Sequence, residues 1–121
     1  MHWCLNVVTQ EAALAEAVLL RAAERLGGIE SMRERRPKAK KERELMNGPG
    51  KICMAMNIDR RMVGQSLRGD SLWITARDIE IGEGDIAGSP RIGIDNSGDA
   101  AAWPLRFFLR GNPNVSAHRH V

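Results

Sequence analysis

The chain opens with apolar and β-branched side chains, which predict a strand over residues 3–8. The next apolar stretch, residues 11–26, is so rich in Ala, Leu and Glu that its propensity favours a helix. A pair of glycines ends that element. Residues 29–36 then have the pattern of a short helix. Pro37 stops it, because proline lacks an amide donor and clashes with the preceding turn.

A second helix is predicted to begin near Pro49, which suits a first helical turn. Asn47 lies in the capping region, and Ile52, Cys53 and Met56 recur at helical spacing. This pattern predicts a capped helix that packs one face against the core.

Short apolar runs between turn residues predict three strands in the second half of the chain. They are residues 71–76, Arg91–Ile94 and the run between Pro104 and Gly111. Glycines mark the loop before the second of these strands, and a polar tail follows the third. Two histidines of that tail, His118 and His120, could bind a metal, but a polar terminus is more typical of disorder.

Composition places the chain among globular domains: 121 residues, 43% of them apolar, with no run long enough to span a membrane. Cys4 and Cys53 each lie in an apolar run without a partner at metal-ligand spacing. They are predicted to be reduced, buried thiols in a cytosolic protein.

The positive charge is concentrated in one segment. The net charge is +3, whereas residues 33–44 hold seven basic and three acidic groups and carry +4 by themselves. A basic segment on a near-neutral body suits a polyanion, most often nucleic acid, with a solvated loop as the alternative. The candidate DNA contacts are Lys38, Lys40 and Lys41. Lys51, in the first turn of the second helix, is a candidate phosphate contact or simply a surface lysine.

Taken in order, several blocks resemble the alkyladenine (3-methyladenine) DNA glycosylase family. The blocks are "MHWCLN" (1–6), "AVLLRA" (17–22), "GIESMRERR" (28–36), "ELMNGPGKICMAMNID" (44–59), "SPRIGID" (89–95) and "WPLRFFLRGNPNVS" (103–116). The resemblance implies an α/β (α+β) fold: one mixed domain with a curved, largely antiparallel sheet and packed helices. Residues 1–116 would be the C-terminal portion of that domain, incomplete at the N-terminus, and residues 117–121 a tail.

The activity that the resemblance implies is base-excision repair: hydrolysis of the N-glycosidic bond of alkylated purines such as 3-methyladenine. The implied partner is double-stranded DNA containing alkylated bases, without metal, organic cofactor or membrane. The full-length family is expected to be monomeric, in the bacterial cytoplasm or a eukaryotic nucleus.

The resemblance also assigns roles to individual residues. Arg21 matches the arginine beside the attacking water, and the backbone carbonyl of Ile94 matches the acceptor of a hydrogen bond from that water. Asn6 matches an asparagine of the base pocket that discourages guanine. Met1 and His2 match residues on the minor-groove side. Arg21 would then follow a turn and lie on a strand, against the helical propensity of this region.

The family's general-base glutamate, stacking aromatics and intercalating tyrosine match no residue in this chain, and the resemblance places them in a preceding portion. We therefore expect the 121 residues alone to be inactive. We also expect exposed apolar faces around Trp3, Leu5, Val7 and Phe107, with poor solubility. Two alternatives remain: a DNA-binding remnant that does not cleave, and a helix-rich interaction domain.

Overall fold

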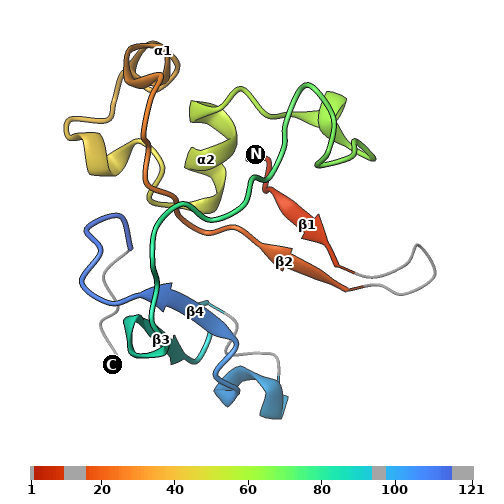
Figure 1. Cartoon of the computed structure of the whole chain (residues 1–121), viewed down its shortest axis with the longest axis vertical. Coiled ribbons are helices and arrows are strands. Elements are labelled where there is room, and N and C mark those ends of the chain that lie inside the picture. Colours follow the sequence, from red (N-terminus) through yellow and green to blue (C-terminus); the bar gives the residue numbers. More distant parts are fainter. Residues whose placement is uncertain (1, 10–15, 94–97, 116–121) are drawn as a thin grey trace. The chain divides into compact units, whose positions relative to one another are not determined.

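The computed structural model describes residues 2–9, 16–93 and 98–115, which fall into two compact units, Met1–Ile74 and Thr75–Val121 (Figure 1). Helices and antiparallel strands occur together, which confirms the α+β class. The described strands form two separate two-stranded sheets. No helix in these ranges is both long and apolar enough to cross a bilayer.

A short hairpin opens the first unit. Strands β1 (Asn6–Val8) and β2 (Ala17–Leu19) pair in antiparallel fashion. The predicted strand over residues 3–8 is thus confirmed at its C-terminal end. The propensity-based helix over 11–26 is wrong for residues 16–26, and residues 11–15 lie outside the described ranges. Pairing with β1 overrides the helical propensity, but β2 ends at Leu19, so Arg21, which the resemblance places on a strand, lies two residues past it.

Both predicted helices are present. Helix α1 (Ile29–Arg35) follows Gly28, whose φ of 67° suits glycine, and it ends before Pro37. Helix α2 (Pro49–Ala55) begins with proline at its first position, as expected.

Two details of α2 differ from the prediction. The residue at its N-cap is Gly48 rather than Asn47. Met56 lies past the last helical residue and is exposed, so Ala55 joins Ile52 and Cys53 on the buried face instead. The helix ends one residue before Met56, and Asn57 adopts a left-handed conformation, φ 56°, just after the C-cap.

The core of the first unit lies between the helices and the start of the chain. Four buried residues form it, namely Leu45, Met46, Ile52 and Ala55. Partly buried side chains pack around them, namely Leu5, Ala23, Ile29, Met32 and Ala39. The Nη1 atom of Arg35 donates a hydrogen bond of 2.8 Å to the carbonyl of Ala55, so α1 also caps the C-terminal end of α2. Two 3₁₀ helices, η1 (Glu42–Glu44) and η2 (Arg60–Met62), flank this core in the sequence.

The second unit is built on another antiparallel pair, β3 (Ile86–Ser89) and β4 (Arg106–Leu109), in which Ser89 faces Arg106 and Ile86 faces Leu109. The 3₁₀ helices η3 (Glu83–Asp85) and η4 (Gly98–Ala102) complete it. Strand β4 confirms the prediction between Pro104 and Gly111.

Two predicted strands are wrong. Residues 71–76 form no strand, and an isolated bridge between Arg68 and Trp73 is the pairing found there. Arg91–Gly93 is not a strand either, and Ile94 lies outside the described ranges. The strand that pairs with β4 is the preceding segment, which the glycine pattern had indicated as loop. It ends at Ser89, because Pro90, the next residue, cannot donate to the ladder.

The solvent exposure of the cysteines and of the apolar residues near the strands can be compared with the predictions. Cys53 is buried, but Cys4 is exposed, so the prediction of two buried thiols is wrong for Cys4. Trp3 and Phe107 are exposed, as expected, with 50% and 69% of their surface accessible. Leu5 and Val7 are instead half-buried, because Leu5 packs on the core.

Candidate nucleic-acid interface

The hairpin brings Asn6 and Arg21 to the same end of its ladder. Asn6 pairs with Leu19, and the Leu20 amide donates a 3.0 Å hydrogen bond to the Leu5 carbonyl, which extends the pairing by one residue. Arg21 follows directly. Asn6 and Leu19 are directly opposite and share one face of the hairpin, and Arg21 lies two residues beyond Leu19. Two predicted site residues, one amide and one guanidinium, thus lie at the same end of the ladder.

The environments of these two side chains differ. Asn6 is exposed, whereas Arg21 is half-buried. Among the described residues, the Arg21 guanidinium forms no hydrogen bond or ion pair. Its five N–H donors are therefore available to a ligand, which is the property an arginine beside a reacting water requires. The other two members of this group of predictions, Met1 and Ile94, lie outside the described residues.

His2 packs on the first turn of α2. A Cβ atom built on Gly50 would lie 2.8 Å from the Cβ of His2. Beside this contact lies an open hollow of about 340 Å³, lined by polar and aromatic groups that include His2, Trp3, Arg35, Asn57 and Asp59. His2 is thus at the rim of a concave surface rather than on an isolated strand end.

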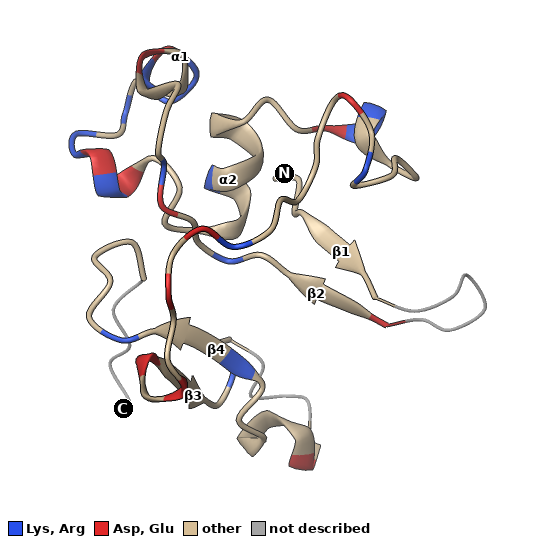
Figure 2. Ribbon diagram, in the orientation of Figure 1, with Lys and Arg blue, Asp and Glu red and all other residues tan. Residues whose placement is uncertain are grey.

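The predicted DNA-contacting lysines lie in the segment between α1 and η1, where the ribbon of Figure 2 is partly blue. Lys38, Lys40 and Lys41 are all exposed, and within the described ranges none of their ammonium groups joins an ion pair. The structure therefore leaves three cations open to solvent in one stretch of four residues. Such a stretch suits a row of phosphates.

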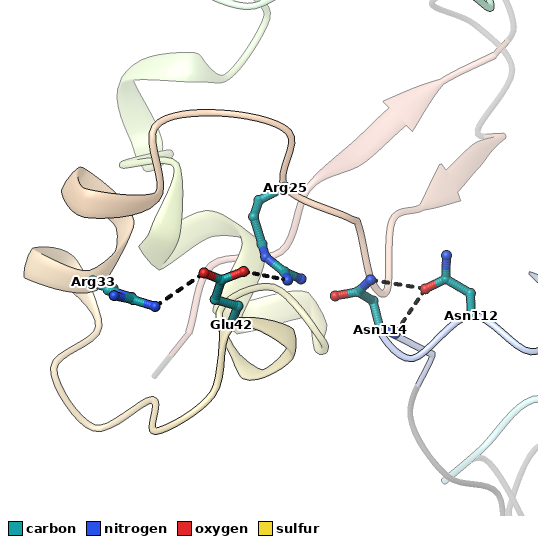
Figure 3. Close-up of polar contacts among 5 residues, drawn as sticks. All are labelled: Arg25, Arg33, Glu42, Asn112 and Asn114. Atoms are coloured by element: carbon teal, nitrogen blue, oxygen red, sulfur yellow. Dashed lines mark hydrogen bonds and ion pairs between the residues drawn. The ribbon is translucent and has the colours of Figure 1, made fainter. Parts of the chain in front are cut away.

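Two acidic groups of the same segment, Glu42 and Glu44, have hydrogen-bonding partners within the first unit. The Glu42 carboxylate accepts from Nη2 of Arg25 at 3.0 Å and from Nη2 of Arg33 at 3.3 Å (Figure 3). Arg25 is the better sheltered partner, with 15% of its side chain exposed against 58% for Arg33. Both partners of Glu42 are arginines and its side chain is 44% exposed, so the three lysines of the segment stay outside these ion pairs.

Glu44 is held in a different way. Its carboxylate accepts the backbone N–H groups of Lys40 at 2.8 Å and of Lys41 at 3.3 Å. These hydrogen bonds lower the pKa of Glu44 below its ordinary value of 4.5, because they favour the charged form. Arg36 donates to the carbonyls of Glu44 and Leu45. The loop that displays the lysines is thus fixed by its own carboxylate and arginine.

Lys51 is exposed, and its Nζ donates a 2.8 Å hydrogen bond to Oδ1 of Asn47. This contact positions the ammonium over the start of α2 and leaves two of its three N–H donors for solvent or a ligand. A phosphate contact by Lys51 stays a prediction.

Within the described ranges, no group of three or more His, Cys, Asp or Glu side chains lies close enough together to hold a metal ion. Burial raises the pKa of Cys53, with Cys4 as a smaller cause. His118 and His120 lie outside the described residues.

Sequence reasoning missed the residues that complete the hollow beside His2. In the sequence, Arg35 is one of several basic residues of the basic segment, and nothing marks it as a site residue. In the structure it lies in the last turn of α1 and lines the hollow. The left-handed conformation of Asn57 could have been predicted from the sequence, because an asparagine just after a helix often adopts it. Asp59 accepts a two-pronged contact from Arg61, with Nε at 2.9 Å and Nη2 at 2.9 Å. That pair lowers the pKa of Asp59, chiefly through the side-chain hydrogen bond.

Comparison with known proteins agrees with the resemblance. The family profile described as methylpurine-DNA glycosylase (MPG) matches residues 1–113. The chain therefore belongs to the methylpurine-DNA glycosylase family.

Three relatives carry the name "Putative 3-methyladenine DNA glycosylase". The Chlorobaculum parvum protein is 45% identical over 118 residues, covering 98% of this chain and 54% of the relative. The Bacillus licheniformis protein is 45% identical over 115 residues, covering 95% and 57%. The Bdellovibrio bacteriovorus protein is 39% identical over 118 residues, covering 96% and 58%. The chain thus spans little more than half the length of these relatives.

Proposed function

We propose that this chain contributes the C-terminal part of a DNA glycosylase that hydrolyses the N-glycosidic bond of alkylated purines such as 3-methyladenine. The observation that carries the proposal is the family match over residues 1–113. The relatives' name supports the substrate class. Double-stranded DNA containing the alkylated base is the proposed partner.

A glycosylase rotates the damaged base out of the duplex before it cleaves the bond to the sugar. In this proposal Arg21 and Asn6, at one end of the hairpin, line the pocket that receives this base. The guanidinium of Arg21 orients the attacking water by fixed donors and keeps a neighbouring carboxylate ionised. The amide of Asn6 excludes guanine from the pocket, because it leaves no room for the exocyclic amino group of that base. The carbonyl of Ile94 accepts a hydrogen bond from the water. The register that places Asn6 opposite Leu19 supports the first two assignments.

The exposed lysines supply the sequence-independent part of DNA binding. Lys38, Lys40 and Lys41 contact phosphates, while Glu42 binds Arg25 and Arg33 and Glu44 binds the backbone amides of Lys40 and Lys41. In the described ranges none of the three ammonium groups is paired with a carboxylate, and that supports a polyanion as partner. His2, which packs on the first turn of α2, and Lys51, which lies in that turn, contribute further contacts, and the resemblance assigns Met1 to the same side of the DNA.

A second candidate is DNA binding without cleavage. The resemblance matches no residue of this chain to the family's general base, and hydrolysis needs a group that activates water. We propose that the 121 residues alone bind duplex DNA and release no 3-methyladenine. Measurable release from methylated duplex by the purified chain would contradict this.

A chimeric protein distinguishes the glycosylase from DNA binding without cleavage. In this chimera, the portion of the Chlorobaculum parvum relative that this chain does not match is fused ahead of residue 1. The release of 3-methyladenine from methylated duplex DNA is then measured. Release by the chimera supports the glycosylase. Binding without release supports the non-cleaving alternative.

Within an active chimera, Arg21→Ala is expected to lower the release rate by about 10²-fold, as removal of one fixed donor does in other active sites. Its duplex Kd should stay within about twofold, since most binding energy comes from phosphate contacts. Arg60→Ala, which replaces an exposed arginine of the same unit, is the control and should leave both values unchanged. Equal rates for Arg21→Ala and Arg60→Ala would remove Arg21 from the mechanism.

A further inference from the structure

Residues 36–45, which we call the lysine loop, are joined at their two ends by a side chain. The Nη1 atom of Arg36 donates hydrogen bonds to the backbone carbonyls of Glu44 and Leu45. The end of the loop belongs to the core, since Leu45 is 1% exposed. The start of the loop is thus held to a buried residue, and the entropic cost of closing the loop is met in the free protein.

Glu44 fixes the middle of the lysine loop. Its carboxylate accepts the backbone N–H groups of Lys40 at 2.8 Å and of Lys41 at 3.3 Å. Because Lys41 is the N-cap of η1 and Glu44 is the third residue of that helix, this is the backward contact of a capping box. The Glu44 amide donates in turn to the Lys41 carbonyl at 3.0 Å. One side chain therefore holds the main chain of two consecutive lysines.

The side chains of the same two lysines stay available to a ligand. Lys40 and Lys41 are exposed, and in the described ranges neither ammonium group pairs with a carboxylate. Fixing the backbone of one residue at the moment of binding lowers affinity by about 5-fold to 30-fold. A loop that is already ordered in the free protein avoids this loss.

We propose that Glu44 is a positioning residue for DNA, which holds the backbone of Lys40 and Lys41 so that both ammonium groups meet phosphates without further ordering of the loop. This inference rests on the proposed DNA binding. It predicts an effect opposite in sign to that of charge alone. A carboxylate repels phosphates, by about twofold in affinity for two charges about 10 Å apart in water, so removing one should tighten binding. Removing Glu44 should weaken it.

Three variants that each lose one negative charge test the sign. Glu44→Ala removes the charge and the acceptor, whereas Glu44→Gln removes the charge and keeps an oxygen that can accept an amide N–H. Glu34→Ala is the matched control: Glu34 is an exposed carboxylate of α1 with no hydrogen bond or ion pair to the described residues. Fluorescence anisotropy at low salt measures the Kd of each variant for duplex DNA.

Glu44→Ala should bind duplex at least about fivefold more weakly than the wild type, since the order of the loop is lost. Glu34→Ala should bind up to about twofold more tightly. Glu44→Gln should stay within about twofold of the wild type, because the amide contact is kept. Equal affinities for Glu44→Ala and Glu34→Ala would overturn the positioning role.

Amide hydrogen exchange of the free proteins separates positioning from stability. In Glu44→Ala the amides of Lys40 and Lys41 should exchange about tenfold faster or more, since their charged acceptor is lost. The Ala23 amide, which donates to the Met46 carbonyl at 3.0 Å, should keep its rate. Faster exchange at Ala23 as well would mean that Glu44 acts through the stability of the whole unit, and would overturn the proposal.

A variant without the lysine charges distinguishes failure of this inference from failure of the DNA contact. Lys38→Gln, Lys40→Gln and Lys41→Gln are combined in one protein. If this protein keeps the wild-type affinity for duplex, the proposed phosphate contacts are contradicted and the positioning role falls with them. If it binds more weakly while Glu44→Ala binds as tightly as Glu34→Ala, the contacts stand and the positioning role alone is overturned.

Discussion

His2 lies directly against the backbone of Gly50, so a Cβ atom at position 50 would be 2.8 Å from the Cβ and 3.0 Å from the Cγ of His2. Carbon atoms in folded proteins do not approach that closely. Glycine is therefore the residue that fits the second position of α2 while His2 keeps its place. The contact joins a predicted DNA-facing residue to the helix that forms the core.

Replacing Gly50 by alanine should destabilise the first unit by about 1–3 kcal/mol, the usual cost of overpacking. The higher helix propensity of alanine offsets up to about 1 kcal/mol of this. Urea unfolding measures the change. Gly27→Ala is the control, because no atom lies within 4 Å of its added Cβ, and it should change little. Adding His2→Gly to Gly50→Ala removes the clash, and failure of that double variant to recover stability would contradict the contact.

Neutralising the three lysines of the basic segment should flatten the salt dependence of duplex binding. Each phosphate contact contributes about 0.9 to the slope of log K against log[salt], so Lys38→Gln, Lys40→Gln and Lys41→Gln together should reduce it by about 2.7. Fluorescence anisotropy over a salt series measures the slope. The corresponding triple arginine variant keeps the charge and should keep the slope. Equal slopes for the glutamine variant and the wild type would show that these lysines do not contact phosphates.

Glu42→Gln should lower the free energy of unfolding by about 1 kcal/mol, because both ion pairs of Glu42 are lost together. Arg33→Ala removes the more exposed pair and should cost less than about 0.5 kcal/mol. The comparison is made by urea unfolding at low and high salt, since screening weakens exposed pairs. A larger loss for Arg33→Ala than for Glu42→Gln would reverse the assignment of the main contact to Arg25.

Glu44 should make the first unit sensitive to acid. Its pKa is lowered in the folded state by the amides of Lys40 and Lys41, so its contribution is complete above the unfolded value of 4.5 and is lost as pH falls through the lower folded pKa. Glu44→Gln should therefore reduce the difference in unfolding free energy between about pH 7 and about pH 3. Unchanged acid sensitivity would mean that the Glu44 carboxylate is not held by these amides.

In the second unit, Phe108→Leu should cost about 1 kcal/mol. The Arg106 guanidinium carbon lies 4.5 Å from the centre of the Phe108 ring, and Arg106 is 6% exposed, so the cation–π contact is sheltered from water. Phe107→Leu is the matched control on the same strand. Phe107 is 69% exposed, and its replacement should change stability by less than about 0.5 kcal/mol. Equal losses for the two variants would contradict a specific role of the ring.

Local rules were sufficient for the elements whose ends are marked by special residues. Pro37 ends α1, Pro49 begins α2, and the run between Pro104 and Gly111 contains β4. Proline fixes its own φ and removes a donor, and these effects do not depend on the rest of the fold. The basic segment was equally visible, since charge is a property of composition.

The sequence by itself thus determined the family, the α+β class, both helices and the position of the basic segment. Tertiary structure alone decided that residues 17–19 pair with β1 against their helical propensity, that 86–89 rather than 91–94 pairs with β4, and that Cys4 is exposed. Strand pairing and burial depend on partners far away in the chain, and local propensity carries no information about them. For the same reason the sequence placed Glu42 among seven positive charges, but only the fold showed that its carboxylate pairs with Arg25, 17 residues away.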